Sequence, residues 1–175
     1  MLLELAQAQL QQVSHGSVVT LHFAMPESDA AAAAMGADVK AEPIVAETLR
    51  NLYDGVPMEE VYKASILAAR TLIEKDPDYT YATARLLMHT IAKEVLGVEA
   101  TQEEMAQHYV DYFPGFIKKG VDNDLLDERL LQFDLKRLGG ALKAERDLQF
   151  DYLGLQTLYD RYFLHVRKTR IELPQ

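Results

Sequence analysis

A proline set between two helical patterns constrains the fold of this chain more than any other feature. The stretch EKDPDYTYATARLL, residues 74–87, places Pro77 behind a run whose apolar residues recur at helical spacing. Proline disfavours the α conformation of the residue before it, so the first helix is expected to stop near Lys75. The run that follows again carries apolar residues three and four positions apart. The pattern predicts an αα-hairpin over residues 57–97, which closes at Gly97.

Each helix of this hairpin carries one apolar stripe, and helical spacing of this kind predicts a buried face. We expect Asp76 or Asp78 to cap the second helix, with Pro77 tolerated in its first turn. Tyr79 and Tyr81 are interpreted as packing residues with hydrogen-bonded hydroxyls rather than as a substrate platform. The stripe residues are Met58, Val61, Tyr62, Ser65, Ala69, Leu72 and Ile73 in the first helix, and Tyr79, Thr83, Leu86, Leu87, Thr90 and Ile91 in the second.

Glycine, proline and capping signals divide the remaining chain into shorter elements. Pro43 suits the first turn of a helix that ends at the YDG turn, residues 53–55. Thr101 and Glu104 match a capping box, which predicts a helix that runs to FPGF, residues 113–116. Short elements follow, then a helix over DYLGLQTLYDRYF and two short strands around the basic turn RKTR.

Near the N-terminus, GSVVTLHF alternates in the manner of a strand, and the alanine-rich run after it suits a short helix. The predicted fold class is therefore mainly α. It is a helical bundle built on an αα-hairpin, with small β-hairpin elements near the two ends of the chain.

Composition restricts the chemistry available to the chain. Among its 175 residues there is no cysteine, which excludes disulfides, thiolate metal sites, cysteine nucleophiles and thiyl radicals. The formal net charge of −9 opposes binding to nucleic acid, because that binding depends on Lys and Arg at phosphates. No apolar run approaches the ~20 residues that a bilayer span needs. The first residues lack the basic start of a signal peptide, so we expect a cytoplasmic protein without a membrane partner.

The residues alone indicate no catalytic centre. The histidines have no metal-ligand spacing, and the acidic stretch DNDLLDE, residues 122–128, lacks the glycine of a calcium loop. The basic run at residues 167–170 is interpreted as a solvated hairpin tip. We therefore assign no catalytic residue and no metal ligand. Two hypotheses remain: a regulatory or scaffolding segment of a larger enzyme, or a freestanding helical interaction module without enzymatic activity. The abrupt end at RIELPQ favours the first.

Several long strings resemble the N-terminal region of the large (alpha) subunit of class I ribonucleoside-diphosphate reductase. The longest begins NLYDGVPMEEVYKAS and continues through DPDYTYATARLL. The others are YFPGFIKKG, LLDERLLQFDL, RDLQFDYLGLQTLYDRYFLHV and RIELPQ, and they occur in the order that the family has them. Together they cover about residues 36–175.

The resemblance implies a role in an enzyme that makes deoxyribonucleotides for DNA synthesis. The family's large subunit reduces ribonucleoside diphosphates with a thiyl radical and a redox-active cysteine pair in an α/β barrel. A separate small subunit supplies the radical, and an N-terminal ATP-cone senses ATP against dATP. By this resemblance, residues 1–97 correspond to a cone-like region whose first ~35 residues diverge. Residues 98–175 correspond to the helical domain before the catalytic barrel.

This chain departs from the family in ways that bear on function. It has none of the catalytic cysteines, so it is expected to be a fragment that is inactive by itself. The cone usually begins with a basic hairpin, whereas Lys40 is the first Lys or Arg here, and Met58 replaces a threonine that some cones use. A triphosphate binds poorly without cations, so the region resembles a degenerate cone.

Lys93 is the one residue that we assign as a candidate contact for the allosteric nucleotide, because it matches the family's cone lysine by its place after ARLL. Arg85 is interpreted as a structural partner of Glu74 or Asp78. The chain itself is expected to hold no cofactor, with ATP and dATP as the family's effectors. The implied partners are the remainder of the large subunit and the radical-generating small subunit. Pairing with a second copy of the chain is left open as an alternative.

Overall fold

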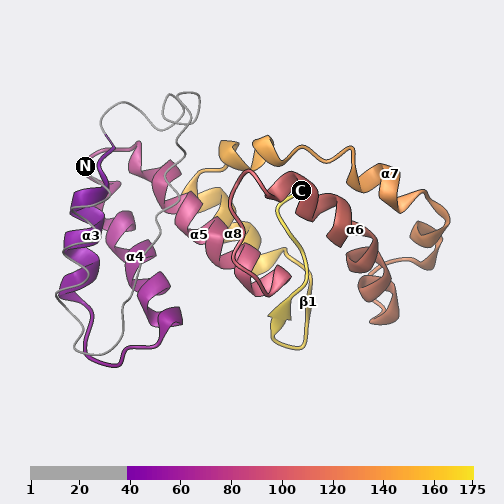
Figure 1. Cartoon of the computed structure of the whole chain (residues 1–175), viewed down its shortest axis with the longest axis horizontal. Coiled ribbons are helices and arrows are strands. Elements are labelled where there is room, and N and C mark those ends of the chain that lie inside the picture. The colour runs from indigo at the N-terminus through magenta and orange to yellow at the C-terminus, as the bar shows by residue number, and fades with distance from the viewer. Residues whose placement is uncertain (1–38) are drawn as a thin grey trace. The chain divides into compact units, whose positions relative to one another are not determined.

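The computed structural model describes residues 39–175, which form helices and one small sheet (Figure 1). The strand predicted over GSVVTLHF and the alanine-rich helix lie outside the described residues. The chain divides into two compact units, Met1–Leu86 and Leu87–Gln175. Each unit is described by itself below. The division falls within one helix, and the domain boundary proposed at residues 97 and 98 stays a prediction. Within residues 39–175, no helix combines the length and the apolarity needed to cross a bilayer.

The first unit contains helices α3 and α4 and the start of α5. Helix α3 spans Ala41–Arg50, α4 spans Met58–Leu72 and α5 spans Tyr79–Leu96. Helices α3 and α4 lie side by side (Figure 1). The core that joins the three elements consists of Ile44, Ala68, Ala69, Tyr79 and Ala82. The small alanines let the helices approach closely, while apolar burial supplies the driving force.

The corner between α4 and α5 forms as the proline pattern predicts. Helix α4 ends at Leu72, and the backbone N–H of Asp76 still donates to the Leu72 carbonyl at 3.0 Å. The Asp76 carboxylate then accepts from the Asp78 N–H at 3.0 Å, so Asp76 caps the turn through Pro77. The Tyr79 hydroxyl donates to the Lys40 carbonyl at 3.1 Å and accepts from the Lys40 N–H at 3.2 Å. The αα-hairpin and the structural role of Tyr79 are therefore confirmed.

Three buried hydroxyls explain why polar residues lie in the apolar stripes. Thr48, Ser65 and Thr83 are buried, and each donates to the carbonyl four residues earlier, at 2.7, 2.8 and 2.7 Å. This bond satisfies the hydroxyl inside its own helix, so the core needs no polar partner for it.

The second unit begins with the remainder of α5 and continues with α6, Met105–Asp122. Short elements follow: the 3₁₀ helix η1, Glu128–Gln132, helix α7, Leu135–Gly139, and the 3₁₀ helix η2, Ala144–Gln149. Helix α8 spans Tyr152–Arg161. Strands β1, His165–Val166, and β2, Thr169–Arg170, pair antiparallel, with His165 opposite Arg170. The C-terminal hairpin and the mainly α fold class are confirmed.

Helix α6 differs from its prediction at both ends. The predicted end at FPGF is wrong, because the helix continues through Pro114 to Asp122. One lost hydrogen bond at Pro114 is outweighed by the burial of Ile117 and Gly120 beyond it. At the start, the Glu104 carboxylate accepts from the Thr101 N–H at 2.8 Å, but it also accepts from the Thr101 hydroxyl at 3.0 Å. Only the glutamate half of the capping box forms, and the helix begins at Met105.

Candidate functional site

Lys93, the candidate nucleotide contact, lies in the last turn of α5. Its ammonium nitrogen is 2.8 Å from Glu99 Oε1, and both side chains are partly exposed. A cation at this end of a helix is favoured by the helix dipole. The structure therefore places Lys93 on an accessible surface, already engaged by a carboxylate that an incoming phosphate would have to displace.

His89 lies one turn before Lys93 and adds little positive charge at neutral pH. Burial is the main cause that lowers the pKa of His89 below its usual 6.5. Glu99 raises this pKa and Lys93 lowers it. An imidazole with a lowered pKa is largely neutral at pH 7. The cluster of Lys93, His89 and Glu99 therefore offers a phosphate one ammonium group beside one carboxylate, which is weak electrostatic attraction for a triphosphate.

A second cluster, which the sequence patterns did not indicate, centres on Glu94 of α5. The Glu94 carboxylate accepts from the Tyr159 hydroxyl at 2.8 Å and from the Arg170 N–H at 2.9 Å. The Arg170 guanidinium lies 3.5 Å from the centroid of the Tyr159 ring and donates to the Tyr159 carbonyl at 2.8 Å. Burial, followed by the bond to Glu94, raises the pKa of Tyr159 to about 12. This cluster fastens β2 and α8 to the end of α5.

A third cluster surrounds a buried carboxylate on η2. Asp147 is only 1 % exposed, and it accepts from the Tyr109 hydroxyl at 2.7 Å and the Gln175 side-chain amide at 2.8 Å. Burial raises the pKa of both Asp147 and Tyr109 above their usual values. The two oxygens are satisfied by donors from α6 and from the last residue of the chain. This arrangement orders the unit and presents no group to a substrate.

No sequence signal could have identified the second and third clusters. Their partners lie 65 and 76 residues apart around Glu94, and 38 and 28 residues apart around Asp147. Helical periodicity and capping patterns report only on neighbours a few positions away. Each member is an ordinary residue of its own element, so only the folded chain brings them together.

The described residues offer hydrogen-bonding and packing groups rather than a reactive centre. No group of three or more His, Asp or Glu side chains among residues 39–175 is arranged to hold a metal ion. In the first unit, burial lowers the pKa of Arg85. Its assignment as a partner of Glu74 or Asp78 stays a prediction. Chemically, the arrangement can hold elements in place and can present one lysine to an anion.

Comparison with known proteins identifies relatives of one kind. No protein-family model matches the chain. The alpha subunit of ribonucleoside-diphosphate reductase from Chlamydia trachomatis serovar D is 44% identical over 125 residues, which are 71% of this chain and 12% of that subunit.

Two further alpha subunits extend the likeness to other bacteria. That of Helicobacter pylori is 35% identical over 124 residues, covering 70% of the chain and 15% of the subunit. The alpha subunit of ribonucleoside-diphosphate reductase 1 from Escherichia coli is 30% identical over 119 residues, covering 67% of the chain and 15% of the subunit. The chain thus matches a stretch of only 12–15% of the length of these relatives.

Proposed function

The chain belongs to the family of ribonucleoside-diphosphate reductase alpha subunits, as part of their N-terminal region, and we propose that it supplies a regulatory and structural segment of such a subunit. The observation that carries this proposal is the identity of 44% over 71% of the chain with the Chlamydia trachomatis subunit. The structural part is supported by two buried or half-buried polar clusters, around Glu94 and Asp147, which order the second unit without forming a reactive centre.

We propose that the activity of the whole subunit, the reduction of ribonucleoside diphosphates, requires groups that this chain lacks. The family's chemistry uses cysteine thiols, and the chain contains no cysteine. Its proposed partners are therefore the remainder of a large subunit, which provides the thiols, and a small subunit, which provides the radical. Cytoplasmic localisation and the formation of a homodimer stay predictions.

The catalytic part of this proposal is tested by assaying two proteins with a reductase small subunit and a dithiol reductant. The purified 175-residue chain is expected to form no deoxyribonucleotide, because it has no thiol to reduce the substrate. A Chlamydia trachomatis alpha subunit that carries this chain in place of its matching segment is expected to remain active. Turnover by the isolated chain, or a folded chimera without activity, would contradict the proposal.

We also propose that the N-terminal part of the segment is a degenerate ATP-cone. This follows from the absence of Lys and Arg before Lys40, and from the single ammonium group of Lys93 beside Glu99. Isothermal titration of the chain with ATP or dATP at millimolar concentration is expected to give no binding heat. Measurable heat would contradict the degenerate cone.

Two variants then decide whether any such heat comes from Lys93. Lys93→Ala removes the candidate contact, and Lys63→Ala removes a matched lysine that pairs with Glu60 at 3.1 Å on the surface of α4. Heat that is lost in the first variant and kept in the second would assign the contact to Lys93. Equal heat in both variants would exclude Lys93 as the nucleotide site.

A further inference from the structure

A proline inside α6 divides this helix into two halves. Pro114 has no backbone N–H, so the Val110 carbonyl lacks the donor that a helix normally provides. Gly115 follows directly, and a Cβ added there would meet nothing within 4 Å, so no side-chain packing stiffens the backbone at this point. We call residues 105–113 the proximal half of α6 and residues 116–122 the distal half.

The proximal half is fastened to distant elements by side-chain hydrogen bonds. The Tyr109 hydroxyl donates to the Asp147 carboxylate on η2 at 2.7 Å. The Tyr112 hydroxyl donates at 2.9 Å to the carbonyl of Ile171, which is fully buried. These partners lie 38 and 59 residues away along the chain, so the proximal half is tied into the core of the second unit.

The distal half is instead attached to the chain that follows it directly. The Gly120 carbonyl accepts from the N–H groups of Leu125 and Leu126, at 2.9 and 3.2 Å. The Leu126 side chain covers Gly120 so closely that an added Cβ would come within 2.5 Å of it. Among the described residues, the hydrogen bonds of the distal half reach no farther along the chain than Leu126. The distal half therefore has no polar tie of its own to the core.

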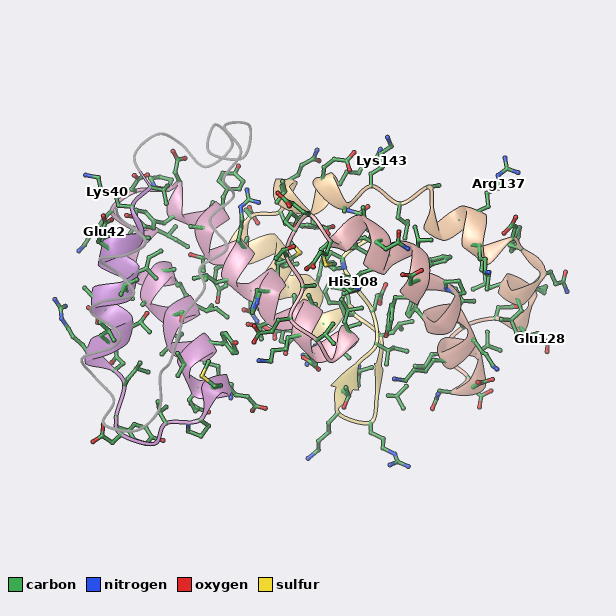
Figure 2. All side chains as sticks on the ribbon, viewed as in Figure 1. Lys40, Glu42, His108, Glu128, Arg137 and Lys143 are labelled. Atoms are coloured by element: carbon green, nitrogen blue, oxygen red, sulfur yellow. The ribbon has the colours of Figure 1, made fainter. Side chains whose placement is uncertain are left out.

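The distal half, the turn after it and η1 form a lobe, residues 116–134, at one end of the second unit (Figure 1). Figure 2 shows Glu128 of η1 at the outer end of this lobe, and His108 of the proximal half farther inside the unit. The lobe thus extends outward from the part of the unit that the proximal half holds together.

The chain returns from the lobe to the level of α6 at which it leaves. Helix α7 follows the lobe, and a Cβ at Gly139 would lie 3.3 Å from Val110 Cα and 3.2 Å from Phe113 Cβ. The outgoing connection at Pro114 and the returning connection at Gly139 therefore lie close together. Two connections at one place allow the lobe to rotate about that place without stretching either of them.

We propose that Pro114 and Gly115 form a hinge about which the lobe of residues 116–134 pivots on the rest of the second unit. Proline is a common cause of sharp bends in helices, and hinges consist of a few backbone positions that absorb the change in angle. The rings of Phe113 and Phe116 lie on either side of the hinge with centroids 6.3 Å apart, so a pivot alters this contact. The hinge does not depend on the proposed function.

Distances between two spin labels test the hinge in the full 175-residue chain, which contains no cysteine, so labels attach only where cysteines are introduced. Ala106→Cys and Asp122→Cys replace exposed residues on the two sides of the hinge, about 24 Å apart in a helix that rises about 1.5 Å per residue. In frozen solution, double electron–electron resonance is expected to give a broad distance distribution. Adding Pro114→Ala is expected to narrow it about twofold, because the alanine N–H restores the helical hydrogen bond.

Two further variants of the labelled pair serve as controls. Lys118→Ala changes an exposed residue of the distal half and keeps the proline, so the width is expected to stay unchanged. Gly115→Ala keeps the proline but restricts the residue after it, so a partial narrowing is expected. A distribution that is equally broad with and without Pro114 overturns the hinge. Should Pro114→Ala lose its helical circular dichroism, Gly115→Ala decides, and an unchanged width there also overturns the hinge.

Hydrogen exchange of the unlabelled chain gives a second measurement. Amides of the distal half are expected to exchange about tenfold more slowly in Pro114→Ala than in the wild type, because the hinge no longer allows local opening. Amides of the proximal half, which is already tied to Asp147 and Ile171, are expected to change less. Equal slowing in both halves would indicate a general stabilisation of α6 and would overturn the hinge.

Discussion

At the scale of single residues, Asp147 shows how the second unit tolerates a carboxylate in its core. Removing a carboxylate from water disfavours its charged form, and here burial outweighs the two hydrogen bonds, which by themselves lower the pKa. The pKa of Asp147 is raised as a result. The folded chain therefore binds a proton at Asp147 more tightly than the unfolded chain does, and its stability is linked to pH.

This linkage predicts a pH-dependent difference between the wild type and Asp147→Asn. A raised folded-state pKa means that the contribution of Asp147 to stability is largest at low pH and is lost as pH rises through the folded-state pKa. Urea denaturation is therefore expected to show the wild type gaining stability relative to Asp147→Asn as pH falls from about 7 toward the unfolded pKa of about 4. A difference that does not vary with pH would contradict the raised pKa.

Glu145→Gln serves as the control for this pH profile. It neutralises an exposed carboxyl two residues away, on the same 3₁₀ helix. The variant is expected to keep most of the pH dependence of the wild type, because burial is the main cause of the raised pKa of Asp147 and the nearby charge of Glu145 adds only a smaller rise. A profile that follows Asp147→Asn instead would assign the linkage to the general acidity of η2.

At the scale of secondary-structure elements, the packing of α7 on α6 depends on a glycine. A Cβ at Gly139 would meet the Tyr109 carbonyl oxygen and the Val110 Cα, each at 3.3 Å. Both are backbone atoms of α6, which cannot move aside as the end of a flexible side chain can. The contact therefore sets how closely the two helices approach.

Gly139→Ala is accordingly expected to lower the free energy of unfolding by about 1–3 kcal/mol through overpacking. The matched control is Gly115→Ala in the middle of α6, where an added Cβ meets nothing within 4 Å. There, alanine is expected to raise stability by about 0.5–1 kcal/mol, because it restricts the unfolded chain and favours the helix. Urea denaturation measures both changes, and equal effects of the two substitutions would contradict the close packing.

Turn and helix-breaking residues in the sequence predicted the elements whose ends depend only on nearby residues. Pro77 fixed the corner of the αα-hairpin, and the basic run at residues 167–170 fixed the turn of the C-terminal hairpin. Pro114 misled the prediction, because a proline costs one helical hydrogen bond, and only the tertiary burial of Ile117 and Gly120 shows that the helix survives it. The clusters around Glu94 and Asp147 were not predictable, since their partners come from distant elements.

At the scale of the whole molecule, the family and the mainly α class were both accessible from the sequence, the family from long ordered strings and the class from helical spacing. The surroundings of Lys93 were not, because a match by position says nothing about the neighbouring Glu99, whose carboxylate lies 2.8 Å from the lysine nitrogen. The exposure of Leu131, Phe133 and Leu138 was also not predictable, since apolar residues in short elements are usually expected to be buried.

The net charge of the whole chain predicts its behaviour toward nucleic acid. A charge of −9 repels phosphates, and few counterions would be released to drive association. An electrophoretic mobility assay with duplex DNA is expected to show no retarded complex, even at about 50 mM salt, where electrostatic attraction is strongest. A retarded band that disappears at higher salt would contradict this expectation.

The bond between Arg170 and Glu94 has a consequence for how the protein is made. The two residues are 76 positions apart, so Glu94 at the end of α5 leaves the ribosome long before its hydrogen-bond donor Arg170 does. At translation rates of about 5–20 residues per second, roughly 4–15 s pass between the synthesis of Glu94 and that of Arg170. The second unit therefore cannot complete this cluster before Arg170 has been synthesised, and a product that stops short of Arg170 would leave the Glu94 carboxylate without this donor.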